Sequence, residues 1–296
     1  MNILVFDFGG TSVKYGVWSH QEIHETHSFP TPDDWESFTS FILKVKNDLG
    51  AKYALEGVAF SFPGAVDSMK GEIRGISPIP YTQHLPIKKR LSQLLSLPIS
   101  IANDANCAAL AELWMGVARD VQNALFVVIG TGIGGVVIFN RKIHYGKHLF
   151  GGEFGVALIN SETPWTEVAT AVHMARRYCR RLGLAEDSVS GQKVFELAKS
   201  GDDVAIGVVG DFYKNLSVGL FNLQTSFDPE MIIIGGGLSA NNEVIENIKK
   251  HLDRLLLKYN FSEIKPEVKA CKFKNSANLI GAVKHFFDEH GGCCDE

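Results

Sequence analysis

Two segments of the chain share one pattern, and this pattern limits the folds that the chain can adopt. The segments "ILVFDFGGTSVKYGVW" (residues 3–18) and "LFVVIGTGIGGVVIF" (residues 125–139) each predict an apolar strand, a glycine-containing turn and a second apolar strand. They begin about 120 residues apart, a recurrence typical of two related lobes that each start with a β-hairpin. The chain has 296 residues, enough for two ordinary domains, and we predict a boundary at residues 116–121.

The rest of the chain alternates between two kinds of periodicity. Further runs rich in β-branched residues lie at 57–60, 99–102 and 231–234. Helical periodicity is found at 35–49, 87–95, 105–117, 166–182, 204–225 and 242–259. This alternation predicts an α/β chain whose sheets are covered by helices.

Composition argues against several classes of protein. The formal charge is −4, and the basic clusters at 88–90 and 176–181 favour solvated helix faces over a nucleic-acid surface. The five cysteines, with Cys293 and Cys294 in a polar tail, include no C-x-x-C pair, so neither a zinc site nor a disulfide framework is predicted. No secretory leader and no apolar run of about 18 residues is recognised, so we expect a cytoplasmic chain without a membrane partner.

The first glycine turn, "DFGGTSVK", has two interpretations. Gly9 and Gly10 would let the backbone approach a ligand closely, and Thr11 would offer its hydroxyl to anionic oxygens. Asp7 could then hold Mg²⁺ through a bridging water, and Lys14 could neutralise phosphate charge. An ordinary hairpin, in which Asp7 accepts from the amides of the turn, explains the same residues.

The second turn, "GTGIGG" at 130–135, has glycine spacing similar to the dinucleotide-binding fingerprint. That fingerprint requires a helix to follow, whereas here the strand-like "VVIF" follows. The segment therefore predicts a phosphate-binding hairpin turn, with Thr131 and the backbone of Gly132 as donors.

A third glycine-rich stretch, "MIIIGGGLSANN" at 231–242, follows an apolar strand and precedes a predicted helix from Asn242. Gly235, Gly236 and Gly237 would permit a flat ligand such as adenosine to lie against the backbone. A flexible loop between strand and helix is the alternative.

The tetrapeptide "NDAN" at 103–106 places a carboxylate between a strand and a helix. Taken alone, Asp104 is explained as the cap of a helix that begins at Ala105. A carboxylate at a strand end is also suited to accept a proton from a reacting hydroxyl.

In this order, the motifs resemble those of the sugar kinase, actin and Hsp70 superfamily, and more closely those of the ROK family of sugar kinases. The similar motifs are "DFGGTSVKYGVW", "FPGAVD", "IANDANCAALAE", "GTGIGG", "GGEFG" and "IIIGGGLS", and they extend from Asp7 to about Gly281.

The resemblance implies a two-lobed, actin-like ATPase (ribonuclease H-like) fold with a ligand cleft between the lobes. The small lobe would span 1–117, completed by a C-terminal helix at 276–290, and the large lobe would span 118–275. The resemblance also implies ATP and Mg²⁺ as cofactors, a sugar as substrate, and a homodimer. Repressors of this family carry a DNA-binding segment ahead of the first phosphate strand, where this chain begins, so no nucleic-acid partner is expected.

Residue by residue, the resemblance implies that Asp104 takes the proton from the attacking hydroxyl and that Asn103 binds neighbouring hydroxyls. Phosphoryl transfer depends mainly on positioning and charge stabilisation, together with such a carboxylate. The other implied sugar contacts are Gly64, Ala65, Val66 and Glu153. A turn carboxylate is the alternative for Glu153.

One departure from the family concerns the metal-binding loop. Val156 stands where most members have a histidine, and "VALINSETPWTEVATAVHMARR" contains no cysteine, so no zinc is predicted. The glutamate that follows this loop in the family aligns with Glu167, for which an exposed acid in the first turn of a helix is the alternative.

Zinc-less members of the family include β-glucoside kinases. We therefore predict phosphorylation of the 6-hydroxyl of a glucose unit in β-glucosides such as cellobiose, with an aglycone accommodated beside Val156. A general hexose kinase of the glucokinase, fructokinase or allokinase type is the alternative with the same chemistry, and a non-catalytic sugar sensor is the alternative without it.

Overall fold

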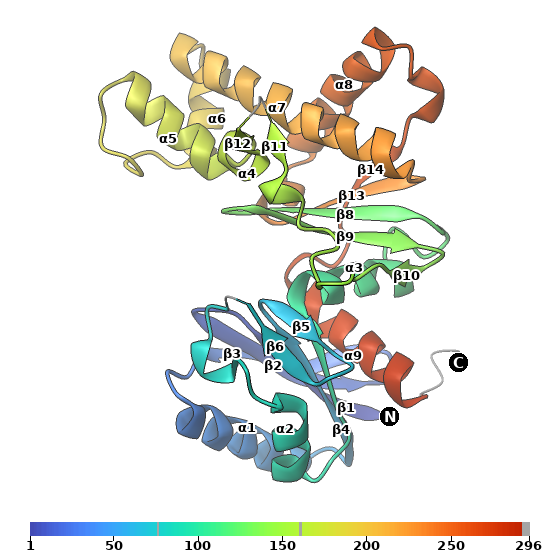
Figure 1. Cartoon of the computed structure of the whole chain (residues 1–296). Helices are drawn as coiled ribbons and strands as arrows, with labels where there is room; N and C mark the ends of the chain where they lie inside the picture. The colour runs from blue at the N-terminus through green and yellow to red at the C-terminus, as the bar shows by residue number, and fades with distance from the viewer. Residues whose placement is uncertain (76, 160–161, 292–296) are drawn as a thin grey trace. The chain divides into compact units, whose positions relative to one another are not determined.

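The computed structural model describes residues 1–75, 77–159 and 162–291, so Cys293 and Cys294 lie outside the described residues (Figure 1). The chain forms two compact units. The first comprises Met1–Arg119, Gly146–Phe150 and Asn275–Glu296, and the second comprises Asp120–Tyr145 and Gly151–Lys274. Both units are mixed α/β structures, as predicted, and each is built around a five-stranded sheet.

The sheet of the first unit has the strand order β3-β2-β1-β4-β7. The first three strands form antiparallel pairs, and β4 and β7 continue the sheet in parallel with β1. The strands are β1 Asn2–Phe8, β2 Ser12–Ser19, β3 Glu22–Pro30, β4 Leu55–Phe62 and β7 Ile99–Asn103, and a small hairpin contains β5 Ala65–Asp67 and β6 Glu72–Arg74. The helical elements are α1 Trp35–Gly50, η1 Pro80–Thr82, α2 Ile87–Leu95, α3 Asp104–Trp114, η5 Lys274–Ser276 and α9 Ala277–His290.

Alternation along the strands gives this first sheet two buried faces. On one face, Phe6 stacks on Phe60 and Phe8 on Phe62, each with ring centroids 5.2 Å apart, above α1 and α2. Residues such as Val5 point to the opposite face, which α3 and α9 cover (Figure 1). Both faces are therefore apolar, and the predicted site residues of this unit lie near the ends of its strands.

Helices α3 and α9 approach each other closely because Gly281 has no side chain. A Cβ built on Gly281 would lie 1.6 Å from the carbonyl oxygen of Cys107. The contact joins the C-terminal helix to the helix that begins at Asp104.

The sheet of the second unit has the order β10-β9-β8-β13-β14, again an antiparallel hairpin extended by parallel strands. Its strands are β8 Ala124–Ile129, β9 Ile133–Phe139, β10 Lys142–Ile143, β13 Met231–Gly235 and β14 Glu267–Ala270, beside a hairpin of β11 Leu158–Ile159 and β12 Thr163–Pro164. Its helical elements are η2 Phe154–Val156, α4 Trp165–Val168, α5 Ala171–Arg181, α6 Gly191–Lys199, α7 Asp203–Phe227, η3 Gly237–Ala240, α8 Asn242–Lys258 and η4 Ser262–Ile264.

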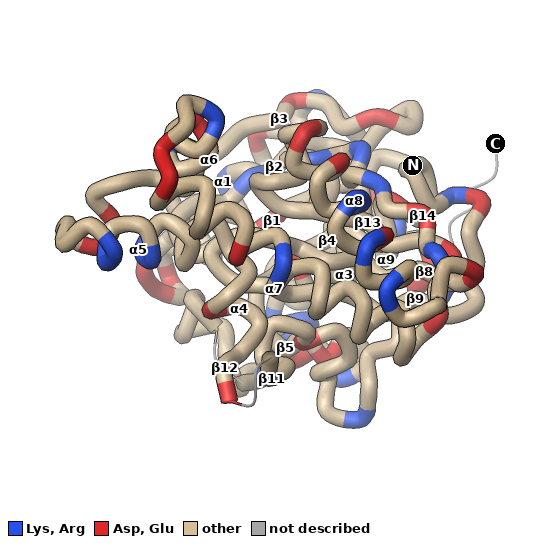
Figure 2. The backbone as a smooth tube through the Cα atoms, turned by 90° about the horizontal axis from the view of Figure 1, so that it is seen from above, with Lys and Arg blue, Asp and Glu red and all other residues tan. Residues whose placement is uncertain are grey.

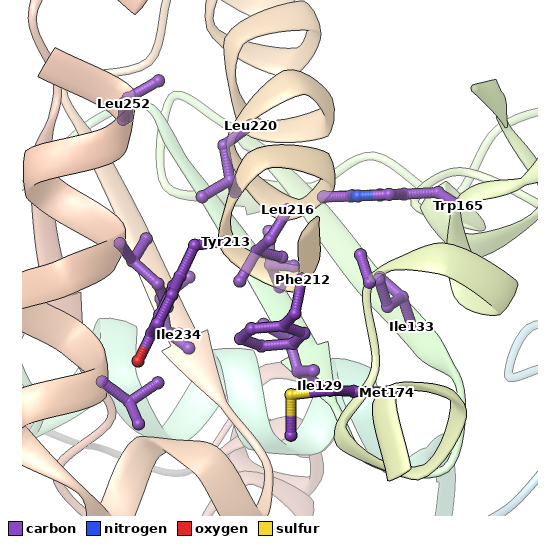
Figure 3. Packing of buried hydrophobic residues seen from close by; sticks show 14 of the residues in the cluster. Ile129, Ile133, Trp165, Met174, Phe212, Tyr213, Leu216, Leu220, Ile234 and Leu252 are labelled. Atoms are coloured by element: carbon purple, nitrogen blue, oxygen red, sulfur yellow. The ribbon is translucent and has the colours of Figure 1, made fainter. Parts of the chain in front are cut away.

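The long helix α7 forms the centre of the second core. Its residues Phe212, Leu216 and Leu220 pack with Ile234 of β13 and Leu252 of α8 (Figure 3). By length and composition α7 is apolar enough to cross a membrane, but its buried residues belong to this core. These contacts account for its apolar character as the core helix of a globular unit.

The predicted helix over 166–182 is two helices in the structure. Between α4 and α5, the hydroxyl oxygen of Thr170 accepts a hydrogen bond from the backbone N–H of His173 and so caps the start of α5. The periodicity continues across the break because both helices bury residues in the same core, among them Trp165 and Met174.

Basic and acidic residues are scattered over the backbone of both units (Figure 2). Most members of the predicted basic cluster at 176–181 are exposed and paired, for example Arg181 with Asp211 at 2.9 Å. Arg177 differs, because its guanidinium is largely buried and donates to the carbonyl oxygens of Glu167 and Val168, each at 3.0 Å. The prediction of a solvated face is therefore wrong for Arg177.

Candidate active site

Asn103, the last residue of β7, caps helix α3. Its side-chain Oδ1 accepts from the backbone N–H of Asn106 at 3.0 Å. Its Nδ2 donates both to the carbonyl oxygen of Gly64, at 2.9 Å, and to Oδ1 of Asp104, also at 2.9 Å. The interpretation of Asp104 as the capping residue is therefore wrong, because Asp104 is the first residue of the helix.

The carboxyl group of Asp104 is buried and unusually basic. Burial raises its pKa to about 6, and the nearby charge of Asp7 adds to the rise. Hydrogen bonds from the backbone N–H of Ala105, at 2.8 Å, and from Asn103 oppose this effect. A carboxylate with this pKa is mostly ionised at pH 7 and accepts a proton more readily than an ordinary aspartate.

The segment after β4 lies next to Asn103. Gly64 has φ +98°, a conformation that favours glycine, and Asn103 binds its carbonyl oxygen. Ala65 and Val66 begin the β5–β6 hairpin, with Val66 buried in the core. The structure thus brings two of the predicted sugar-binding segments, 64–66 and 103–104, together within the first unit.

Asp7 lies at the end of β1, opposite Lys14 on β2. Its Oδ1 accepts from Oγ of Ser61 at 2.7 Å and from Nδ2 of Asn278 at 3.0 Å. Burial raises the pKa of Asp7, whereas these two donors and the charge of Lys14 act in the opposite direction. Within the turn, the N–H of Gly9 donates to the carbonyl oxygen of Ser12 and not to Asp7. The explanation in which Asp7 accepts from the amides of an ordinary hairpin turn is therefore wrong.

The tip of the first turn is open. Gly10 and Thr11 are exposed, and a Cβ on Gly10 would lie only 3.0 Å from that of Pro78. Lys14 reaches the carbonyl oxygen of Asn275 at 3.4 Å. The exposed tip leaves the groups proposed for phosphate binding accessible.

A single carboxylate is a common protein contribution to a Mg²⁺ site. Within the described ranges, no group of three or more His, Cys, Asp or Glu side chains is arranged to hold a metal ion. Mg²⁺ in nucleotide sites usually keeps several waters and uses one or two carboxylates together with phosphate oxygens. Asp7 beside the exposed first glycine turn therefore fits this ion.

The second glycine turn joins β8 to β9. The N–H of Gly130 donates to the carbonyl oxygen of Gly132 at 2.9 Å, and Thr131 is exposed at the tip. A Cβ on Gly130 would meet no atom within 4 Å, so packing does not require glycine there.

The glycines of the third turn serve different purposes. A Cβ on Gly235 would lie 2.7 Å from the ring of Phe126, and one on Gly236, which has φ +81°, would lie 2.3 Å from the carbonyl oxygen of Ile129. These two glycines are required by the fold. A Cβ on Gly237 would meet nothing within 4 Å, so packing does not require glycine there.

The "GGEFG" segment packs against β9. Gly152 has φ +105°, and its Cβ would lie 2.2 Å from the carbonyl oxygen of Gly135. The next residue, Glu153, is exposed, and Val156 is 68% exposed. Glu167 is also exposed, on α4, so both predicted sugar-binding glutamates of the second unit have accessible side chains.

Sequence reasoning missed Ser61, Asn278 and Thr166. Asn278 contacts Asp7 across 271 residues of sequence, and Thr166 accepts from the N–H of Ile133 at 3.0 Å. No sequence motif marks these three residues, since each contacts a segment remote from its own.

The chain matches the ROK family over residues 3–288. It is 33% identical to a β-glucoside kinase of Listeria monocytogenes, over 98% of each chain. It is 30% identical to an N-acetyl-D-glucosamine kinase of Mannheimia succiniciproducens, over 95% of this chain and 98% of that one.

Solved structures agree with these relatives. A ROK family protein from Streptococcus pneumoniae, in complex with sucrose, superposes with a TM-score of 0.89 at 32% identity, over 98% of this chain and 99% of that one. A ROK family glucokinase from Streptomyces griseus, in complex with glucose and AMPPNP, gives a TM-score of 0.76 at 27% identity, over 96% and 98%.

The fold and these likenesses define the class of the protein, an ATP-dependent sugar kinase with the actin-like ATPase fold. Because the family match covers nearly the whole sequence, the chain belongs to the ROK family.

Proposed function

We propose that the protein transfers the γ-phosphoryl group of ATP to the 6-hydroxyl of a glucose unit, preferentially in β-glucosides such as cellobiose. The observation that carries this proposal is the carboxyl group of Asp104, held by Asn103 at the start of α3 with its pKa raised to about 6. Such a group is suited to accept a proton near neutral pH.

In the proposed reaction, the hydroxyl oxygen forms a new bond to the γ-phosphorus and its proton goes to Asp104. The bond between the γ-phosphorus and the oxygen of the leaving ADP breaks. Asn103, the backbone of 64–66, Glu153 and Glu167 are the proposed sugar contacts. Carboxylates that accept from hydroxyl pairs orient a sugar through charge-assisted hydrogen bonds.

The three glycine turns are the proposed nucleotide contacts. The turn at 9–11 and the turn at 131–132 bind phosphates, Lys14 neutralises their charge, and 235–237 lies against adenosine. Mg²⁺ held by Asp7 through water would neutralise charge on the β- and γ-phosphates. The glycines at 130 and 237, which packing does not require, support this assignment.

The preference for glycosides is supported by Val156 and by the named relatives. Val156 is exposed beside the segment that carries Glu153, so a bulky substituent on the sugar would meet an apolar side chain there. The β-glucoside kinase of Listeria monocytogenes is 33% identical over 98% of each chain. The alternative, a general hexose kinase, is supported by the glucokinase of Streptomyces griseus solved with glucose.

An ATP-coupled assay over glucose, fructose, mannose, allose, N-acetylglucosamine, cellobiose and gentiobiose tests the proposal. We expect the highest kcat/KM with the β-disaccharides and a loss of at least about a hundredfold in kcat for Asp104→Asn. Asp33→Asn, a matched change at an exposed position, is the control. Turnover of glucose without turnover of either disaccharide would support the general hexose kinase, and sugar binding without ATP consumption would support a sensor.

We also propose that the protein is a homodimer, on the family resemblance alone, and that it is cytoplasmic, on the sequence features described above. Light scattering after size-exclusion chromatography gives the molar mass directly. A mass near that of a single 32.5 kDa chain would contradict the dimer.

A further inference from the structure

The second glycine turn is tied to a segment outside its own hairpin. Ile133, the first residue of β9, pairs with Ile129 across the hairpin, and its backbone N–H donates to Oγ1 of Thr166 at 3.0 Å. This N–H lies where the chain leaves the turn. A contact here therefore restrains the direction in which Thr131 and Gly132 point.

Three segments meet at the hydroxyl of Thr166. Thr166 is half-buried on α4, and a Cβ built on Gly155 would lie 2.4 Å from its Oγ1 and 2.0 Å from the carbonyl oxygen of Ile133. The "GGEFG" segment thus fits against this hydrogen bond only because residue 155 is glycine. The glycine turn, the segment with Glu153 and helix α4 are packed as one cluster.

Helix α4 is held from outside at both of its ends. Arg177 of α5 donates to the carbonyl oxygens of Glu167 and Val168, each at 3.0 Å, while Thr166 receives the N–H of Ile133. A helix of 4 residues has no room for a ladder of its own hydrogen bonds, so outside contacts decide its orientation. Glu167 follows Thr166 directly and takes its orientation from the same contacts.

We propose that Thr166 is a positioning residue that holds the second glycine turn and the Glu167 segment in one arrangement, so that nucleotide binding and sugar binding depend on each other. The inference rests on the proposed function, which assigns phosphate to the turn and sugar to Glu167. Without the hydroxyl, the N–H of Ile133 loses its acceptor, and the turn and α4 can shift independently.

The test compares Thr166→Val, which keeps the side-chain shape and removes the hydroxyl, with Thr166→Ser, which keeps the hydroxyl. We expect Thr166→Val to raise KM for ATP and KM for the sugar together, each on the order of tenfold, and Thr166→Ser to stay within about twofold of the wild type. Thr225→Val removes an exposed hydroxyl that bonds within α7, and it should leave both constants unchanged. Should Thr166→Val fail to fold, Thr166→Ala replaces it.

Amide hydrogen exchange of Ile133 supplies a readout that does not depend on activity. The amide should exchange faster in Thr166→Val than in the wild type and be protected again in Thr166→Ser. Wild-type KM values in Thr166→Val, or a rise in only one of the two, would overturn the inference. Failure of the proposed function is distinguishable, because the wild-type protein would then consume no ATP with any sugar tested.

Discussion

Asn103 donates its side-chain amide to Oδ1 of Asp104 at 2.9 Å while its own Oδ1 caps the same helix. Because Asn103 caps the helix, Asp104 is not required for that role. Asn103 also donates to the carbonyl oxygen of Gly64, in the loop after β4. One side chain therefore connects the proposed proton acceptor, the helix start and a proposed sugar-binding loop.

The first prediction concerns the pH dependence of turnover. Asp104 must be ionised to accept a proton, and burial raises its pKa to about 6. The value of kcat/KM for the sugar, measured at saturating MgATP, should therefore fall about tenfold per pH unit below a break near pH 6. An aspartate of ordinary pKa would give a break near pH 4 instead. A profile that stays flat down to pH 4.5 would contradict the raised pKa of Asp104.

The second prediction is that Asp104→Asn stabilises the fold at neutral pH. The folded-state pKa, about 6, exceeds the ordinary value of 3.8, so ionising this carboxyl group opposes folding. Wild-type stability from this group is fully present below pH 3.8 and is lost as the pH rises through 6. The variant should thus be more stable by on the order of 1 to 3 kcal/mol at pH 8 and equally stable near pH 3.5.

Urea unfolding of the wild type and of Asp104→Asn at both pH values checks this prediction. Asp33→Asn, at an exposed position, controls for the loss of one negative charge and should show no such pH-dependent gain. An Asp104→Asn variant less stable than the wild type at pH 8 would show that the hydrogen bonds from Asn103 and Ala105 outweigh the effect of burial.

Much of the fold could be predicted because its core elements carry strong apolar periodicity. The helix Ile87–Leu95 has the predicted bounds, with Ile87, Leu91 and Leu95 buried at helical spacing. Strand β3, Glu22–Pro30, was not predicted, because it is an edge strand in which most residues are polar and most are exposed. Helix α6, Gly191–Lys199, was not predicted either, although Val194, Leu197 and Ala198 form a short apolar stripe that packs against the second core.

The sequence could propose those candidate site residues that lie within short local motifs. Asp7, Asp104 and the glycine turns are of this kind. Asn278 and Thr166 are not, because each acts across a long sequence separation that only the fold closes. The identity of the helix cap also depended on structure, since Asn103 and Asp104 are both good capping residues and adjacent in sequence.

The third prediction separates glycines that the fold requires from one that a ligand requires. Gly236→Ala would strain a residue at φ +81° and force its Cβ to 2.3 Å from the carbonyl oxygen of Ile129, so the thermal midpoint should fall by several degrees. Gly237→Ala meets nothing within 4 Å and should unfold at the wild-type temperature.

The ligand-dependent part of this prediction is a loss of nucleotide affinity. Gly237→Ala should weaken the binding of ADP by on the order of tenfold in calorimetry, because a methyl group would occupy the space proposed for adenosine. Gly201→Ala, also at an open position but in a loop after α6 with φ +91°, shows what backbone strain alone does to stability. Unchanged ADP affinity in Gly237→Ala would remove residue 237 from the nucleotide site.

The fourth prediction concerns substrate preference and Val156. Val156 is 68% exposed, so Val156→His should fold normally, while it places a polar ring where we propose that the aglycone lies. The ratio of kcat/KM for cellobiose to that for glucose should fall by on the order of tenfold, since one or two contacts typically decide such discrimination. Leu158→His, a matched change at another exposed apolar position, tests whether any polar ring nearby has this effect. If the ratio stays constant in Val156→His, the aglycone does not lie beside residue 156, and glycoside preference must depend on contacts elsewhere.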